Sequence, residues 1–164
     1  MSKAMDWVTR LATCYPLGQM PKAPGTWGSL PGLVLGPLIY SASHTQAVVD
    51  PWLFATLCLL CFSLLSWKII DHTEKLWGTH DDKSIVIDEV AGQAIPLAFF
   101  PWDPLMLGIA FALFRLFDIS KPLAIGWADR KVHGSLGTLL DDLLAGLVVL
   151  VFFVLDQNFS QWIF

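Results

Sequence analysis

The chain alternates between long apolar runs and shorter polar connectors. The apolar runs cover about residues 30–42, 52–70, 90–100, 105–117 and 139–155. They have helical lengths, and they are too continuous for the strict alternation of a half-buried strand. The pattern therefore predicts an all-α fold with about five apolar helices.

One of these runs is the clearest candidate for a membrane span. Residues 52–70 carry no charge before Lys68, and about 20 apolar residues are needed to cross a bilayer. The other runs are shorter, so we expect their helices to extend into the polar flanks, to insert only halfway, or to be buried by neighbours. With 164 residues, the chain suits a single domain over residues 1–164.

Composition and charge strengthen the membrane interpretation. Apolar residues make up 55% and charged residues 15% of the chain, against roughly 45–50% and about 25% in soluble domains. If the N-terminus is cytoplasmic and five helices cross, all ten Lys and Arg fall on the cytoplasmic side. The connectors 43–51, 101–104 and 156–164 then contain none, which is the positive-inside pattern. We expect a compact, multi-pass bundle in a cytoplasmic membrane, with no nucleic-acid partner because no basic block exists.

Two acidic pairs are the main candidates for chemistry. Asp88-Glu89 and Asp141-Asp142 each begin an apolar run, and Gly92 and Gly146 follow them four residues after an acid. Adjacent carboxylates in apolar surroundings require a cation or hydrogen bonds, and small residues let helices approach closely in a membrane. Two facing helices that hold a hard cation such as Mg²⁺ fit this pattern. The alternative is a favourable helix-dipole effect of acids at a helix N-terminus.

A loop rich in glycine opens the first apolar run. Gly25 and Gly28 leave backbone amides accessible, Thr26 and Ser29 add hydroxyl groups, and Lys22 adds a positive charge. At a helix N-terminus these groups suit a phosphate. The alternative is an ordinary turn in which Thr26 or Ser29 caps the helix.

A third group of polar residues follows the fourth apolar run. Arg115, Asp118, Lys121 and Arg130 lie in a short stretch. A cationic clamp for phosphate oxygens beside a metal-binding Asp118 is one interpretation. The other is a helix-end salt bridge with snorkelling basic side chains. For the neighbouring His133, a surface position is favoured over a catalytic one.

These motifs, taken in order, resemble the phosphatidylglycerophosphatase A family of bacterial inner-membrane lipid phosphatases. The resemblance rests on three blocks: Ala23-Pro24-Gly25-Thr26-Trp27-Gly28-Ser29-Leu30; Asp81 with Ile87-Asp88-Glu89-Val90-Ala91-Gly92; and Phe114-Arg115, Asp118, Lys121-Pro122, Asp129-Arg130, His133-Gly134, Gly137 and Asp141-Asp142. It covers about residues 7–146 and implies an all-α fold.

The resemblance implies Mg²⁺-dependent hydrolysis of phosphatidylglycerophosphate to phosphatidylglycerol and phosphate, at a site facing the cytoplasm, in phospholipid biosynthesis. From the chemistry of the side chains, Asp88, Glu89, Asp141 and Asp142 are the predicted metal ligands, and they are candidate catalytic residues together with Asp118. The predicted substrate-binding residues are Lys22, Gly25, Thr26, Gly28, Ser29, Arg115, Lys121 and Arg130.

Other functions compete with this prediction. A cation carrier would use the same acids as an ion path, but it favours ionisable groups near the middle of the membrane. A non-catalytic membrane subunit has no use for a phosphate-binding loop. A phosphotransferase acting on CDP-activated lipid requires a spaced-aspartate motif that the sequence lacks. The sequence leaves open the oligomeric state and the preference among lipid phosphates.

Overall fold

The computed structural model describes residues 4–156, apart from the side chains of Leu123, Ala124 and Asp129. Asp129, one of the residues of the family resemblance, therefore lies outside the described side chains. Every regular element in this part of the chain is helical, as predicted. The elements are α1 (Trp7–Ala12), the 3₁₀ turn η1 (Leu17–Gln19), α2 (Pro24–Gly28), α3 (Gly32–Thr45), α4 (Pro51–Trp77), α5 (Ile87–Leu97), α6 (Pro104–Ser120), α7 (Leu123–Lys131) and α8 (Ser135–Leu155).

The five predicted apolar runs correspond to α3, α4, α5, α6 and α8. Local signals fix several of their ends. Asp50 and Asp103 cap α4 and α6 by accepting backbone N–H bonds, and each is followed by a proline, which suits the first helical position. Gly78 ends α4 in the left-handed conformation that favours glycine.

Membrane crossing is supported for fewer helices than predicted. Among the described residues, only α4 and α8 are long and apolar enough to cross a membrane. Helix α5 has 11 residues and is about 16 Å long, about half the thickness of the hydrocarbon core. Five membrane-crossing helices are therefore not confirmed, and the expectation that some apolar helices are short fits α5.

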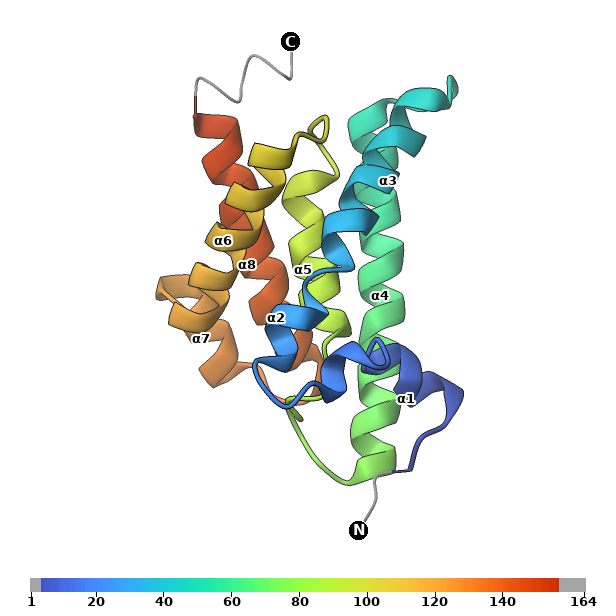
Figure 1. The fold of residues 1–164 in the computed structure, drawn as a ribbon, viewed down its shortest axis with the longest axis vertical. Coiled ribbons are helices and arrows are strands. Elements are labelled where there is room, and N and C mark those ends of the chain that lie inside the picture. Colours follow the sequence, from blue (N-terminus) through green and yellow to red (C-terminus); the bar gives the residue numbers. More distant parts are fainter. Residues whose placement is uncertain (1–3, 157–164) are drawn as a thin grey trace.

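Helix α5 forms the centre of the bundle. It packs against α3, α4, α6 and α8, and all residues from Val90 to Ala98 are buried. Figure 1 shows α5 behind α3 and α6, with α4 and α8 alongside. This arrangement explains why α5 beyond its first turn is apolar on every side apart from the buried Gln93.

Two glycines allow α5 and α8 to come into backbone contact. A Cβ atom placed on Gly146 would lie against the carbonyl oxygen of Gly92, and one placed on Gly92 would lie against the carbonyl oxygen of Asp142. The predicted role of small residues, a close approach of the two acid-bearing helices, is what the structure shows. The crossing brings the acidic turns of α5 and α8 to the same end of the bundle, beside α2 and the C-terminal end of α6 (Figure 1).

Gly146→Ala should destabilise the fold, because the added methyl group meets the backbone of α5. We expect a loss of about 1–3 kcal/mol. The matched control is Gly108→Ala on α6, where the added methyl group meets nothing within 4 Å. Alanine's better helix propensity should make that control neutral or up to about 1 kcal/mol more stable. Thermal unfolding in detergent, followed by circular dichroism, measures both variants. Equal midpoints for the two variants would contradict the proposed tight contact.

Candidate active site

The first turn of α5 carries one acidic pair into the interior. The Asp88 side chain is buried, and Asp88 Oδ1 accepts a bond from the Glu89 backbone N–H at 3.0 Å. Burial, followed by the nearby Glu89 charge, raises the pKa of Asp88 well above its usual range. Burial also raises the pKa of Glu89 to about 8, although Arg115 acts in the opposite direction. A further positive charge in the site would favour the ionised form of both groups.

The second acidic pair lies deeper in its helix than predicted. Helix α8 begins at Ser135, so Asp141 and Asp142 fall in its second turn and both are buried. The effect of the helix dipole is confined to the first turn. The helix-dipole alternative therefore does not account for this pair, whereas it remains applicable to Asp88 and Glu89 in the first turn of α5.

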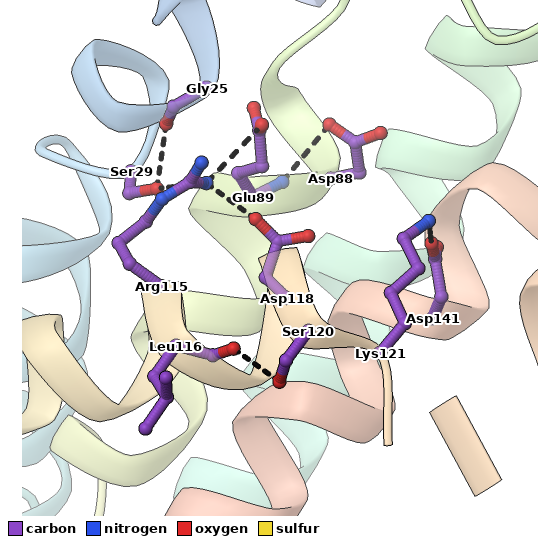
Figure 2. Close-up of polar contacts among 10 residues, drawn as sticks. All are labelled: Gly25, Ser29, Asp88, Glu89, Arg115, Leu116, Asp118, Ser120, Lys121 and Asp141. Atoms are coloured by element: carbon purple, nitrogen blue, oxygen red, sulfur yellow. Dashed lines mark hydrogen bonds and ion pairs between the residues drawn. The ribbon is translucent and has the colours of Figure 1, made fainter. Parts of the chain in front are cut away.

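Arg115 is the cation nearest the first acidic pair. Its Nη1 atom lies 2.6 Å from Asp118 Oδ2 and 3.6 Å from Glu89 Oε1. Figure 2 shows the three side chains pointing toward one another, with Asp118 one turn beyond Arg115 on α6. The predicted pair between residues three apart is therefore present. Because it also reaches Glu89, Arg115 joins α6 to α5 as well as forming a pair within its own helix.

Lys121 provides the corresponding cation for α8. Its Nζ donates to Asp141 Oδ2 at 2.6 Å (Figure 2). Lys121 follows the last residue of α6 in a left-handed backbone conformation (φ 44°). The chain turns sharply there, and the turn leaves the lysine at the border of the cleft that α8 also lines.

The glycine-containing loop supports the site in a different way from the one predicted. Residues 24–28 form the short helix α2, and the Thr26 and Ser29 amides donate to the carbonyls of Ala23 and Gly25. These amides are thus already bonded within the turn. Gly25 allows close contact with Glu89, because a Cβ atom there would collide with the Glu89 carboxylate.

Ser29 is a buried support for Arg115. Its hydroxyl donates to the Gly25 carbonyl at 2.8 Å and accepts from Arg115 Nη1 at 3.4 Å. Gly28 packs against Val86, while Thr26 is half-buried and Lys22 is exposed. The loop thus contributes Gly25 to the cleft surface and Ser29 behind it.

The two acidic pairs and both cations open into one cleft of about 390 Å³. Of the predicted site residues, the cleft is lined by Gly25, Asp88, Glu89, Arg115, Asp118, Lys121, Asp141 and Asp142. Lys22, Thr26, Gly28, Ser29 and Arg130 do not line it. Arg130 and His133 are exposed, which agrees with the surface position favoured for His133.

Several lining residues were not among the predicted site residues. They are Ala23, Pro24, Asp81, Asp82, Lys83, Ile85 and Thr138. The loop that carries Asp81, Asp82 and Lys83 leads directly into α5, so its closeness to Asp88 along the chain was the available signal. Thr138 lies three residues before Asp141 on α8, a spacing that places both on one helix face.

Glu74 holds this loop in place. The Oε1 atom of Glu74 accepts the Asp81 backbone N–H at 2.9 Å, contacts His80 Nδ1 at 3.0 Å, and accepts the Thr138 hydroxyl at 3.3 Å. One carboxylate at the end of α4 therefore connects the loop to the first turns of α8. No sequence motif marks Glu74, because its partners come from distant parts of the chain.

Among the described residues, the buried carboxylate oxygens of the site that lack a protein hydrogen-bond donor include Glu89 Oε2 and Asp142 Oδ1. In the part of the chain that the structure describes, no group of three or more Asp, Glu, His or Cys side chains is arranged so that it could hold a metal ion. The carboxyl groups line a polar cleft in which Arg115 pairs with Asp118 and Lys121 pairs with Asp141. Buried oxygens of this kind fit a hard cation.

Buried carboxylates beside a guanidinium and an ammonium group, on a helical scaffold with apolar outer faces, are typical of an enzyme that processes a phosphate group. The family model of phosphatidylglycerophosphatase A matches residues 10–156, and the chain belongs to this family. The chain is therefore a phosphatase, as predicted.

Curated relatives agree with this assignment. Phosphatidylglycerophosphatase A of Haemophilus influenzae is 40% identical over 147 residues, which cover 87% of this chain and 85% of that protein. Phosphatidylglycerophosphatase A of Escherichia coli K12 is 35% identical, with 84% and 76% covered. A putative phosphatidylinositol-3-phosphatase of Bacteroides thetaiotaomicron is also 35% identical, with 84% and 85% covered. No solved structure matches the chain.

Arg115→Gln should lower phosphate release strongly, because it removes the cation between Glu89 and Asp118. A loss of kcat/KM on the order of 100-fold is expected for a charge that contacts a phosphate in a buried site. Arg130→Gln is the matched control, since Arg130 is exposed and outside the cleft. A steady-state phosphate-release assay should show less than about a threefold change for the control. The assignment of Arg115 to the site fails if the two variants lose activity equally.

Proposed function

We propose that the chain hydrolyses the phosphomonoester of phosphatidylglycerophosphate, with Mg²⁺ as its cofactor, giving phosphatidylglycerol and phosphate in phospholipid biosynthesis. The single observation that carries the proposal is the cleft in which three buried carboxylates, of Asp88, Asp141 and Asp142, and the half-buried one of Glu89 meet Arg115 and Lys121. Family membership supports the reaction class, and two relatives that cover most of the chain are named for this substrate.

The carboxylates fit a bound Mg²⁺. Asp88, Glu89, Asp141 and Asp142 would hold it, and oxygen donors are the ligands that this ion prefers. Glu89 Oε2 and Asp142 Oδ1 are buried oxygens without a hydrogen-bond donor among the described residues, so they are available as metal ligands. When bound, the ion would neutralise charge on the phosphomonoester and polarise it.

The chain's own cations bind and orient the phosphate. Arg115 presents a planar donor group whose position is fixed by Asp118 and Ser29, and guanidinium groups suit phosphate oxygens. Lys121 and Lys83 add charge at the cleft border. When substrate binds, Lys121 turns part of its hydrogen bonding from Asp141 to the phosphate of the substrate. One of the acids lining the cleft serves as general base.

Membrane association fits the two long apolar helices, α4 and α8. We extend it to a multi-pass protein of the bacterial inner membrane whose cleft faces the cytoplasm. The distribution of Lys and Arg supports this orientation, because the connectors 43–51 and 101–104 contain neither residue. A lipid substrate then keeps its acyl chains in the bilayer while its phosphate reaches the cleft.

The predicted alternatives, a cation carrier and a non-catalytic subunit, are not favoured by membership of a phosphatase family. The Bacteroides relative carries the name of a different lipid phosphatase. What the names of all three relatives share is a phosphate ester on a lipid headgroup. The proposal selects phosphatidylglycerophosphate because the family model and two of the three relatives carry that name.

Removal of divalent cations should abolish turnover. Purified protein treated with EDTA is expected to release phosphate from phosphatidylglycerophosphate at less than about 1% of the untreated rate, because the buried carboxylates lose their countercharge. Added Mg²⁺ should restore the rate. Full activity in EDTA would overturn the cofactor proposal while leaving the lipid phosphatase activity intact.

Asp142→Asn should lower kcat by about 100-fold or more while the helical fold persists, because the substitution keeps the shape and removes the charge. The matched control is Asp103→Asn, which exchanges one good helix cap for another outside the cleft. Initial rates of phosphate release, with circular dichroism of both variants, make the comparison. Near-normal turnover of a folded Asp142→Asn protein would remove Asp142 from the site.

A further inference from the structure

An apolar groove runs between α3 and α6. It has a volume of about 260 Å³ and is lined by Leu33, Val34, Pro37, Leu38 and Ser41 of α3, by Trp102, and by Leu107 of α6. Helices α3 and α6 both pack on α5, as Figure 1 shows. Two apolar side chains that line the groove, Val34 and Leu38, are each 61% exposed.

The groove and the active-site cleft lie along the same pair of helices. Leu33 in the groove comes four residues after Ser29, which accepts a hydrogen bond from Arg115. Leu107 in the groove comes eight residues before Arg115 on α6, and Arg115 lines the cleft. The contact between Ser29 and Arg115 therefore lies about one helical turn from the groove on the α3 side and about two turns from it on the α6 side.

The length of this path suits an acyl chain. Eleven residues separate Pro104, at the start of α6, from Arg115, a distance of about 16 Å along a helix. One leaflet of a bilayer has a hydrocarbon thickness of about 15 Å. A lipid whose phosphate lies beside Arg115 thus has chains that reach the end of the groove near Trp102.

A second apolar groove does not meet the cleft in this way. It has a volume of about 390 Å³ and is lined by residues of α4, α5 and α8 that include Leu60, Phe99 and Leu147. A cluster of buried side chains that includes Ile70, Ile87 and Leu139 fills the space between these helices toward the acidic end. Neither groove shares a described lining residue with the cleft, so the filled space toward the acidic end is what separates the second groove from the cleft.

We propose that the groove between α3 and α6 binds an acyl chain of the lipid substrate, and so selects lipid phosphates over water-soluble ones. The proposal rests on the proposed function and adds a specificity site to it. The phosphate binds at Arg115, and the hydrocarbon lies on Leu33, Val34, Pro37 and Leu38. The apolar contact supplies binding energy at a distance from the reacting phosphate.

The test compares two substrates with the full chain in detergent micelles. One is diacyl phosphatidylglycerophosphate, and the other is the same headgroup without acyl chains. Val34→Trp and Leu38→Trp each place a larger side chain in the groove. The kcat/KM for the diacyl substrate divided by that for the substrate without acyl chains should then fall by about tenfold or more, because an apolar pocket loses its fit to the acyl chain. Leu60→Trp is the matched control, because Leu60 is similarly exposed at 55% but lines the other groove. Its ratio should stay within about twofold of the original.

The outcomes separate the two proposals. An original chain that releases phosphate from neither substrate overturns the proposed function, and the acyl-chain site with it. The acyl-chain site alone is overturned if the original chain releases phosphate normally from both substrates and folded Val34→Trp and Leu38→Trp show an unchanged kcat/KM ratio. The groove then contacts ordinary membrane lipid. A fall in the ratio for Leu60→Trp equal to that for Val34→Trp also overturns it, because the effect is then not specific to one groove. Circular dichroism confirms that each variant is folded.

Discussion

The withdrawal of four carboxylates from water where α5 meets α8, three of them buried and that of Glu89 half-buried, is the constraint on which the rest of the structure depends. Moving ionised acids out of water is costly unless opposite charges or hydrogen bonds compensate. Arg115 and Lys121 provide opposite charges from α6 and from the turn after it. Helices α6 and α2 and the loop before α5 all contribute residues to the cleft around this charge.

The helix contacts place the acids at one end of an otherwise apolar bundle. Backbone contact between α5 and α8 at Gly92 and Gly146 requires that neither residue has a side chain. The acidic turns then lie on the side of this crossing where α2 and the end of α6 also lie (Figure 1). The opposite end carries the capping residues Asp50 and Asp103. A polar cleft thus adjoins apolar helix faces, which is the geometry that a lipid phosphate requires.

Much of the fold could be predicted from local pattern, and the site only in part. Five apolar runs predicted five helices, because helix length and periodicity are local properties. The start of the last helix was predicted at residue 139, whereas α8 begins at Ser135. Residues 135–138 are partly polar, so the apolar run did not include them although they are helical. Lys83 and Thr138 lie close to Asp88 and Asp141 along the chain but belong to no motif. Glu74 had no signal in the sequence, because it meets Thr138 through packing between distant segments. Lys22 and Arg130 shared a charge pattern with Arg115 but lie outside the cleft.

The sequence by itself determined that the chain is helical, that acids interrupt its apolar runs, and that glycines follow those acids at helical spacing. These are properties of neighbouring residues, so they do not depend on the fold. Only the tertiary structure decided which cation meets which acid and that Ser29 supports Arg115. It also decided that the amides of the glycine-containing loop bond within their own turn. Side-chain contacts between helices depend on crossing positions and rotations, which a single sequence does not specify.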